Sequence, residues 1–246
     1  MNFWIKTGRF LNRLTDLAIG IALSVVLLYG LYSLWDTYRV YDGAGLSSGI
    51  AKYKPEKDSP GEALKKLMEI NPDVCAWITI DKTGIDYPVV QGEDNAVYLN
   101  HDVYGEYSLS GSIFLDYKNS RDFSDCYSLL YGHHMSQGKM FGDLDKYVEK
   151  AFFDSHQSGT LYLPQGAYPI EIFAFLDTDA YDNHVFQPDR ISWEDKEALL
   201  TYIEEKAMWI SGTVPGEEER ILGFSTCDSD RTDGRYMAFA RVIDKH

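Results

Sequence analysis

Cys227 and Arg235 are two residues whose types and spacing are suited to covalent catalysis. Both lie in the segment 219–242, which reads E-R-I-L-G-F-S-T-C-D-S-D-R-T-D-G-R-Y-M-A-F-A-R-V. Two apolar, β-prone runs, Ile221–Thr226 and Tyr236–Val242, flank a polar stretch, a pattern typical of a β-hairpin with a longer loop. In such a hairpin Cys227 ends the first strand and faces Arg235 at the start of the second.

This arrangement suggests a nucleophile beside a positive charge. A thiol attacks as the thiolate, and a nearby cation favours the thiolate. A guanidinium can also stabilise the oxyanion of a tetrahedral intermediate. The alternative is that Cys227 is a small buried apolar residue and Arg235 a solvated charge at the edge of a sheet. The rest of the chain favours the catalytic interpretation.

The missing partner is a base, and the segment L-L-Y-G-H-H-M offers His133 and His134 directly after a predicted strand. Because Gly132 interrupts the strand, the next side chain projects from its end, where functional sites are often built. A histidine there can transfer a proton near neutral pH. The alternative is a pair of surface histidines without a catalytic role.

The sequence offers little support for a metal site. The adjacent histidines are not part of an H-E-x-x-H pattern, and the chain has no C-x-x-C pair. The acidic segment 177–183 superficially resembles a calcium loop, but it lacks the central glycine, and Pro188 stands where the closing Glu is required. We therefore expect no metal and no other cofactor.

The three cysteines, Cys75, Cys126 and Cys227, are too few and too far apart to form a disulfide framework. Cys75 and Cys126 lie in apolar runs and are predicted to be buried, whereas Cys227 lies in a polar setting.

The formal net charge of −15 argues against a nucleic-acid partner, because binding phosphates requires clustered Lys and Arg.

An apolar run of uncharged residues, Leu17–Trp35, lies near the N-terminus. As a helix it would be roughly 28 Å long, about the thickness of the hydrocarbon core of a bilayer. The run exceeds the usual length of a signal peptide's apolar core, so we expect an uncleaved anchor instead of a cleaved signal. The basic residues that precede it, Lys6, Arg9 and Arg13, predict a cytoplasmic N-terminus.

The predicted organisation is a cytoplasmic segment 1–16, a membrane anchor 17–35, a stalk 36–58 and a catalytic domain 59–246. Ser59-Pro60-Gly61-Glu62 begins a short helix that Asn71-Pro72 ends. A further short helix is predicted at Gln137–Val148 and a longer one at Ser192–Ile210. Besides the hairpin, strands are predicted at Cys75–Ile80, Ile85–Val90, Ser112–Tyr117, Cys126–Tyr131, Thr160–Leu163 and Tyr168–Leu176. About eight short strands favour a mostly β fold, a barrel or sandwich with helical insertions.

The combination of Y-G-H at 131–133, S-T-C at 225–227 and Arg235 on the next strand resembles the sortase family over about residues 60–244. Sortases are extracellular cysteine transpeptidases of Gram-positive bacteria with an eight-stranded β-barrel. Within the family the chain is most similar to class B members. The similarity lies in the first helix, in the segments V-V-Q-G-E-D-N-A-V-Y-L-N and G-S-I-F-L-D-Y, and in the long helix before the cysteine strand.

The resemblance implies a role for individual residues. Cys227 is similar to the family nucleophile, His133 to the general acid and base, and Arg235 to the group that holds the oxyanion. Ser225 and Thr226 are expected to line the substrate groove. Asn95 matches a polar position proposed to assist the histidine, and we expect it in the substrate-binding set.

The implied reaction is cleavage of a C-terminal sorting signal of the N-P-x-T-x type after Thr, through a thioester on Cys227. The acceptor is expected to be an amine of peptidoglycan or of its lipid-linked precursor. This places the catalytic domain outside the cell on a single-pass anchor. Two alternatives remain open: a catalytically silent binding module on a sortase barrel, and a sortase of another class with a different sorting motif. The S-H-G-C pattern of L,D-transpeptidases and the early cysteine of papain-like proteases are both absent.

Overall fold

The computed structural model describes residues 2–43, 48–227 and 231–243. The chain forms two compact units, Met1–Asp42 and Gly43–His246, and each is described by itself. The predicted anchor 17–35 lies within the described residues, and so does the predicted catalytic domain 59–246 except for residues 228–230 and 244–246.

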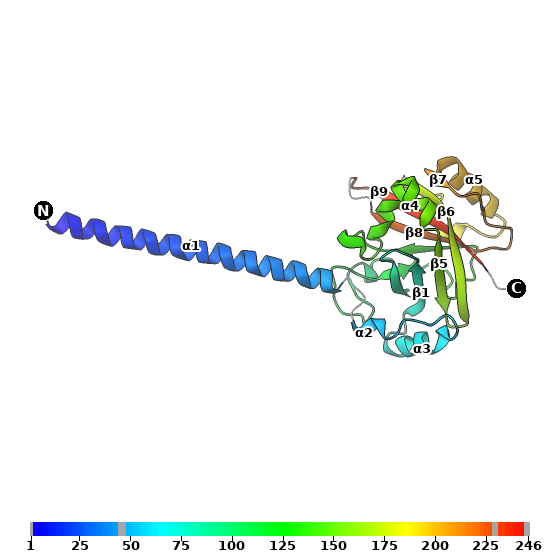
Figure 1. The fold of residues 1–246 in the computed structure, drawn as a ribbon, viewed down its shortest axis with the longest axis horizontal. Coiled ribbons are helices and arrows are strands. Elements are labelled where there is room, and N and C mark those ends of the chain that lie inside the picture. The colour runs from blue at the N-terminus through cyan, green and yellow to red at the C-terminus, as the bar shows by residue number, and fades with distance from the viewer. Residues whose placement is uncertain (1, 44–47, 228–230, 244–246) are drawn as a thin grey trace. The chain divides into compact units, whose positions relative to one another are not determined.

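The first unit is a single long helix, α1, which spans Asn2–Gly43 (Figure 1). Residues Thr7–Tyr38 are long and apolar enough to cross a membrane, and none of that segment's most apolar part is buried by protein. The helix extends beyond the predicted anchor into the predicted stalk, because no Gly or Pro interrupts residues 31–42. A short helix, α2 (Ser48–Ala51), follows.

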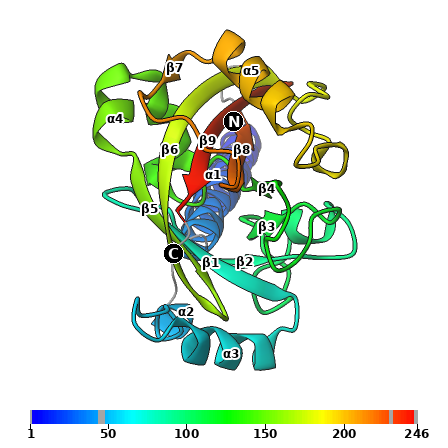
Figure 2. The same cartoon turned by 90° about the vertical axis from the view of Figure 1, so that its right-hand side faces the viewer.

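The second unit is built on a closed β-barrel (Figures 1 and 2). Its strands are β1 (Val74–Ile80), β2 (Asp86–Val90), β3 (Ile113–Leu115), β4 (Tyr127–Tyr131), β5 (Ser158–Leu163), β6 (Gly166–Asp179), β8 (Ile221–Cys227) and β9 (Gly234–Val242). The order β5-β1-β2-β3-β4-β8-β9-β6 is closed by pairing of β5 with β6, and the two-residue β7 (Trp209–Ile210) adds to β6. The prediction of a mostly β, eight-stranded barrel with helical insertions is confirmed.

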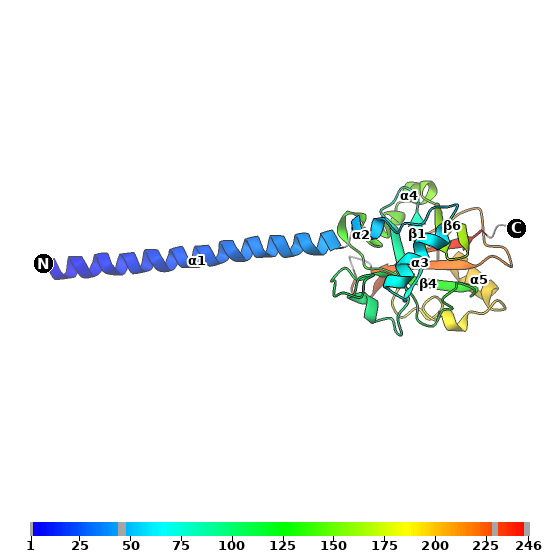
Figure 3. The same ribbon diagram turned by 90° about the horizontal axis from the view of Figure 1, so that it is seen from below.

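The strands are apolar on both faces because the barrel is covered outside as well as filled inside. In β8, Leu222 and Phe224 belong to the interior core, whereas Ile221 belongs to an outer cluster under α5 (Lys196–Lys206). On another side, helix α3 (Pro60–Ile70) packs Leu64 and Leu67 against strands β1 and β5 (Figure 3). Burial on two faces replaces the alternation of polar and apolar residues expected for a half-exposed strand.

Helix α3 begins and ends where the sequence predicts. Ser59 occupies the N-cap position and Pro60 the first turn, but the Ser59 side chain makes no capping hydrogen bond. The helix ends before Asn71, whose side-chain amide donates to the hydroxyl of Tyr98 and to the carbonyl oxygen of Val103.

The helix predicted at Gln137–Val148 is wrong. The structure has two 3-10 helices, η2 (Ser136–Gly138) and η3 (Gly142–Val148), followed by helix α4 (Lys150–Ser155). Gln137 and Met140 have positive φ angles of 63° and 55°, which an α-helix does not allow. The apolar spacing in this segment comes from burial of successive turns against the barrel.

The helix predicted at Ser192–Ile210 is too long at both ends. The N-cap of α5 is Asp195, and the Ser192 hydroxyl donates to the Asp195 carboxylate at 2.6 Å in a turn before the helix. At the other end, β7 pairs with β6. Trp209 and Ile210 therefore extend a sheet, which local periodicity cannot distinguish from a last helical turn.

Two further 3-10 helices are η1 (Val97–Leu99) and η4 (Pro188–Arg190).

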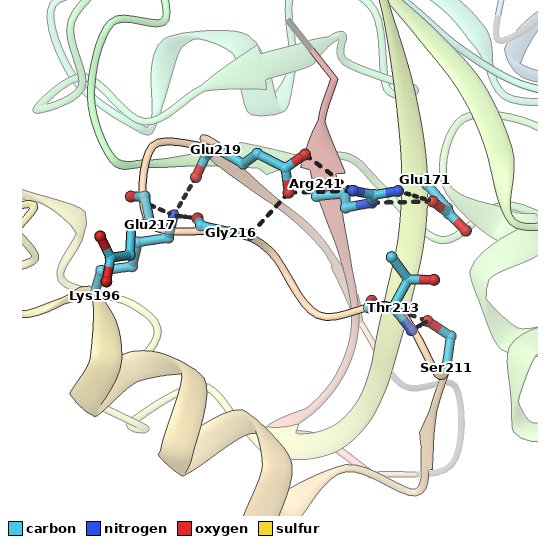
Figure 4. Close-up of polar contacts among 8 residues, drawn as sticks. All are labelled: Glu171, Lys196, Ser211, Thr213, Gly216, Glu217, Glu219 and Arg241. Atoms are coloured by element: carbon cyan, nitrogen blue, oxygen red, sulfur yellow. Dashed lines mark hydrogen bonds and ion pairs between the residues drawn. The ribbon is translucent and has the colours of Figure 1, made fainter.

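The loop that enters β8 is held by two cations, the buried Lys196 and the half-buried Arg241 (Figure 4). The Lys196 ammonium, on a residue only 4% exposed, donates to the carbonyl oxygens of Gly216, Glu217 and Glu219. The Glu219 carboxylate binds Arg241 of β9 at 2.9 Å, and Arg241 binds Glu171 of β6 at 2.7 Å. The start of β8 is thus tied to α5, β9 and β6, which fixes the register of the strand that ends in Cys227.

Candidate active site

The β8–β9 hairpin places Cys227 directly opposite Arg235. The two residues are register partners in the antiparallel pair, with Thr226 opposite Tyr236 next along the ladder. Cys227 is exposed and Arg235 is half-buried. The predicted pairing across the hairpin is therefore confirmed, whereas residues 228–230 of its loop lie outside the described residues.

A second pairing brings the histidine to the same edge of the barrel. Strands β4 and β8 run parallel with Tyr131 beside Ser225, and the backbone N–H of Gly132 donates to the Ser225 carbonyl oxygen at 3.1 Å. Parallel neighbours end at the same edge of a sheet. His133, directly after Gly132, and Cys227, two residues after Ser225, consequently line one pocket.

Gly132 is required at this point because of close packing. A Cβ atom on this residue would lie 2.4 Å from Cδ1 of Ile113 and 2.7 Å from the ring of Phe141. Both neighbours are buried in the interior core. The glycine lets the chain pass the core closely as it leaves β4, and this path determines where His133 projects.

The ring of His133 is oriented by one hydrogen bond to the backbone. Its Nε2 lies 2.7 Å from the carbonyl oxygen of Leu99. A carbonyl oxygen only accepts, so Nε2 carries the proton of this bond. In the neutral ring Nδ1 is then the unprotonated nitrogen, available to accept a proton.

A pocket of about 390 Å³ contains every residue that the sequence analysis placed in the site. Those residues are Asn95, His133, Ser225, Thr226, Cys227 and Arg235. The remaining lining residues, which the sequence analysis did not assign to the site, are Leu99, Phe114, Tyr131, Gly132, Ala180 and Phe186. The structure thus brings together six stretches of the chain, around residues 95–99, 114, 131–133, 180–186, 225–227 and 235.

Arg235 provides a positive charge that no described acidic side chain neutralises. Its Nη1 donates to the carbonyl oxygen of Gly234 at 2.8 Å, and among residues 2–43, 48–227 and 231–243 no carboxylate forms an ion pair with it. Its charge also acts on Tyr131. Burial and Asp116 raise the pKa of the Tyr131 phenol, and the positive charge of Arg235 acts to lower it. An unpaired guanidinium in a pocket is suited to bind a negative oxygen.

Thr226 adds a hydroxyl with unused hydrogen-bonding capacity. The residue is 2% exposed, and its Oγ1 has no hydrogen-bond partner within the described part of the chain. A buried hydroxyl without a partner is costly in a folded protein. Because Thr226 lines the pocket, a bound ligand could supply the missing partner.

Asn95 lies in the pocket wall, and among the described residues its amide hydrogen-bonds to Asp116 and Tyr117 and not to His133. Its Nδ2 donates to Oδ2 of Asp116 at 2.8 Å, and its Oδ1 accepts from the backbone N–H of Tyr117 at 3.0 Å. These two bonds hold the amide against the end of β3. The ring of His133 donates instead from Nε2 to the carbonyl oxygen of Leu99.

The other candidates from the sequence lie outside the pocket. His134 contacts the Asp145 carboxylate at 3.1 Å, so only the first histidine of the pair belongs to the site. In the acidic segment 177–183, the Asp182 carboxylate accepts hydrogen bonds from Thr178 and Tyr202. No group of three or more metal-ligating side chains occurs among the described residues.

The three cysteines differ in exposure as the sequence predicts. Cys75 and Cys126 are buried, and all three thiols are free. Burial raises the pKa of Cys75 to about 12, and it also raises the pKa of Cys126. Cys227 is the exposed member of the set, which makes it the thiol that reagents and substrates can reach.

Comparison with known proteins identifies the chain's relatives. The protein-family model described as "Sortase domain" matches residues 78–243. Sortase B from Listeria monocytogenes is 34% identical over 188 residues, which cover 75% of each chain.

Solved structures of similar sequence share the fold. A class B sortase from Streptococcus pyogenes involved in pilus biogenesis is 41% identical, with a TM-score of 0.67, over 72% of this chain and 96% of that one. Sortase B from Clostridium perfringens is 35% identical, with a TM-score of 0.68, over 73% of this chain and 99% of that one.

Proposed function

This chain belongs to the sortase family of cysteine transpeptidases and is of the class B kind, and we propose that it cleaves a C-terminal sorting signal of the N-P-x-T-x type after Thr. The observation that supports this proposal is the meeting of Cys227, His133 and Arg235 in one pocket. The substrate protein that carried the sorting signal is then transferred to an amine of peptidoglycan or of its lipid-linked precursor.

In the first step, the Cys227 thiolate attacks the carbonyl carbon of the Thr residue. Arg235 stabilises the negative charge that develops on the carbonyl oxygen. The Thr226 hydroxyl, which has no hydrogen-bond partner among the described residues, is a further donor for the bound peptide. The C–N bond breaks as protonated His133 gives its proton to the departing amine. The products are a thioester on Cys227 and the free C-terminal fragment.

In the second step, an amine attacks the thioester carbon. His133 accepts the amine's proton at Nδ1, because Nε2 is held by Leu99. The C–S bond breaks, a new amide forms, and Cys227 leaves as the thiolate. The histidine therefore acts once as an acid and once as a base, and the cycle ends in its starting protonation state.

The anchor gives this reaction a location. We place α1 across the membrane as a single span, with the N-terminus in the cytoplasm and the catalytic unit outside; Lys6, Arg9 and Arg13 before the apolar run support that orientation. Substrates and lipid-linked precursors held at the same surface gain effective concentration from this confinement. Protease added to intact cells should digest the 59–243 region and leave a tag at residue 1 intact.

A panel of quenched fluorogenic peptides tests the proposed cleavage. The full chain in detergent micelles is mixed with N-P-Q-T-N, N-P-K-T-G and L-P-E-T-G peptides, with Cys227→Ala as the control. We expect cleavage after Thr of an N-P-x-T peptide and a covalent adduct on Cys227 by intact mass. Preference for L-P-E-T-G would identify a sortase of another specificity. Absence of both turnover and adduct would favour the catalytically silent binding module.

A second candidate acceptor is an amine on another protein. The Streptococcus pyogenes relative is described as a class B sortase involved in pilus biogenesis, and its 41% identity is what favours this alternative. An acceptor panel of a cross-bridge peptide, a Lys-containing protein segment and water separates the two. The acceptor that speeds release of the thioester and appears in the product is the one the enzyme uses.

A further inference from the structure

Asp116 is a buried carboxylate directly behind the pocket wall. It follows β3, is 2% exposed, and is not itself a pocket-lining residue. Its Oδ2 accepts hydrogen bonds from Nδ2 of Asn95 at 2.8 Å and from the Tyr131 hydroxyl at 3.0 Å. Both of these donors do line the pocket, so one carboxylate holds two of its polar groups.

Asp116 is itself held firmly. Its Oδ1 accepts the backbone N–H of Lys118 at 3.0 Å. Its own carbonyl oxygen accepts from Nε2 of Gln91 at 2.9 Å, and its N–H donates to Leu129 of β4 at 2.8 Å. The carboxylate therefore has a fixed position from which it can orient its neighbours.

The hydrogen-bonding capacity left on the two neighbours follows from simple counting. An amide nitrogen has two hydrogens and an amide oxygen accepts. Asn95 gives one hydrogen to Asp116 and uses its oxygen on Tyr117, which leaves one N–H. Tyr131 gives its only hydroxyl hydrogen to Asp116, so the phenol oxygen can only accept.

The ring of Tyr131 cannot easily turn away from this arrangement. It stacks on Phe114 at 5.2 Å between centroids and on Phe186 at 6.4 Å. Burial and the charge of Asp116 raise the pKa of Tyr131, so the hydroxyl keeps its proton at neutral pH. The acceptor is thus held in place by packing as well as by its bond to Asp116.

We propose that Asp116 is a positioning residue that sets the polarity of the substrate pocket, so that Asn95 presents an N–H donor and Tyr131 a hydroxyl acceptor to an amide group of the substrate. The proposal rests on the proposed function and deepens it. A carboxamide or a peptide group carries both a C=O and an N–H, and it matches this donor–acceptor pair. A carboxylate lacks the donor and would meet the charge of Asp116.

Asp116→Asn tests the proposal with almost no change of shape. The new amide has one accepting oxygen and one donating nitrogen, so it cannot accept at both of its ends. Asn95 and Tyr131 both donate to Oδ2, whereas the backbone N–H of Lys118 donates to Oδ1. If the new nitrogen replaces Oδ2, Asn95 and Tyr131 face a donor and must turn; if it replaces Oδ1, it faces the N–H of Lys118 and the amide must shift. In either orientation the negative charge that strengthens the two bonds is lost, and the polarity of the pocket is weakened.

Asp125→Asn is a matched control, because Asp125 also accepts from a side-chain amide and a backbone N–H, those of Asn119 and Ser120, outside the pocket.

The assay uses the full chain in detergent and two arms that separate the two sources of an amide. In the first arm, each Asn or Gln side chain of the best peptide is replaced by Asp or Glu and by Leu. In the second arm, each backbone amide is replaced by an ester. In the wild-type protein one of these changes should lower kcat/KM by about tenfold, the scale of one lost hydrogen bond in a desolvated site.

The preference for that one amide is the ratio of kcat/KM for the original peptide to kcat/KM for the substituted peptide. In Asp116→Asn this ratio should fall towards one, whereas Asp125→Asn should retain the wild-type ratio. Tyr131→Phe should lower the same preference, and the double variant Asp116→Asn/Tyr131→Phe should lose little more. The rate of Cys227 alkylation by iodoacetamide should stay within about twofold of wild type, since it does not depend on the amide contact. If Asp116 had only a structural role, Asp116→Asn would lower kcat/KM for all peptides and the alkylation rate together. That result would overturn the proposal.

A failure of the proposed function is distinguishable from a failure of this inference. If the wild type cleaves no peptide, binding of the same peptides is measured by calorimetry on Cys227→Ala and on Cys227→Ala/Asp116→Asn. Amide-dependent affinity that the second substitution removes still supports the role of Asp116. Equal affinity for amide, acid and ester peptides in Cys227→Ala overturns it.

Discussion

The backbone N–H of Gly132 donates to the carbonyl oxygen of Ser225 at 3.1 Å, and this bond joins the strand that leads to His133 to the strand that leads to Cys227. The two strands are about 90 residues apart in the sequence and parallel in the barrel. The relative placement of acid–base and nucleophile therefore depends on non-local pairing, and the first prediction concerns this point.

Gly132→Ala should destabilise the protein by about 1–3 kcal/mol, the usual cost of adding a methyl group to a packed core. The added Cβ would meet Ile113 and Phe141 at less than 3 Å, so β4 or the start of the histidine loop must move. We expect a lower melting temperature and a fall in kcat/KM larger than the stability loss explains. Gly212→Ala is the control, because its Cβ would have no neighbour within 4 Å. Equal effects of the two substitutions would contradict the packing argument.

Native alkylation should modify one cysteine. Iodoacetamide at neutral pH is expected to label Cys227, which is exposed, and to spare Cys75, which is buried and whose pKa burial raises to about 12. Peptide mapping after labelling checks this, with protein unfolded in urea as the control in which all three thiols react. Rapid labelling of Cys75 or Cys126 in the native protein would show that the barrel opens.

Arg235→Met should lower kcat by about 10²–10³, the range found when one oxyanion donor is removed. Its effect on folding should be small, because no ion pair links Arg235 to another described residue. Arg235→Lys keeps the charge and loses the planar pair of donors, so we expect intermediate activity. Single-turnover formation of the thioester is the measurement. Unchanged acylation in Arg235→Met would remove Arg235 from the first step.

Asp182 should make stability depend on acid pH. Burial works to raise its pKa, but hydrogen bonds from Tyr202, Thr178 and His184 outweigh burial, and the net pKa lies below its ordinary value. The unfolded chain therefore binds the proton more readily than the folded protein. The stabilisation is present above about pH 4 and is lost as the pH falls through the folded-state pKa.

Thermal unfolding of the wild type and Asp182→Asn at pH 7, 5 and 3 measures this contribution. The wild type should melt higher at pH 7 and 5, and the difference should shrink towards pH 3. Asp81→Asn is the matched control for general acid effects, because Asp81 is exposed and its side chain forms no hydrogen bond or ion pair with a described residue. A difference between wild type and Asp182→Asn that stays constant with pH would contradict the assignment.

The sequence by itself determined the features that depend on neighbouring residues. The hairpin that pairs Cys227 with Arg235 follows from two β-prone runs around one polar loop, and its register is a local property. The apolar run Leu17–Trp35 and helix α3 are equally local, because composition and a Pro at the first turn specify them. The strand that ends at Gly132 indicated His133 and His134, and the family resemblance selected His133 from this pair. No local pattern could give its place in the pocket.

Only the tertiary structure decided what depends on packing between distant segments. Gln137–Val148 has helical spacing, yet close contacts around Gly138 and Gly142 impose 3-10 turns, and Trp209 pairs with β6 instead of extending α5. Asp116 was invisible in the sequence because its importance comes from the Asn95 and Tyr131 side chains that converge on it. Strand order, and with it the composition of the pocket, is fixed by the free energy of burying apolar surface across the whole barrel, which no local window contains.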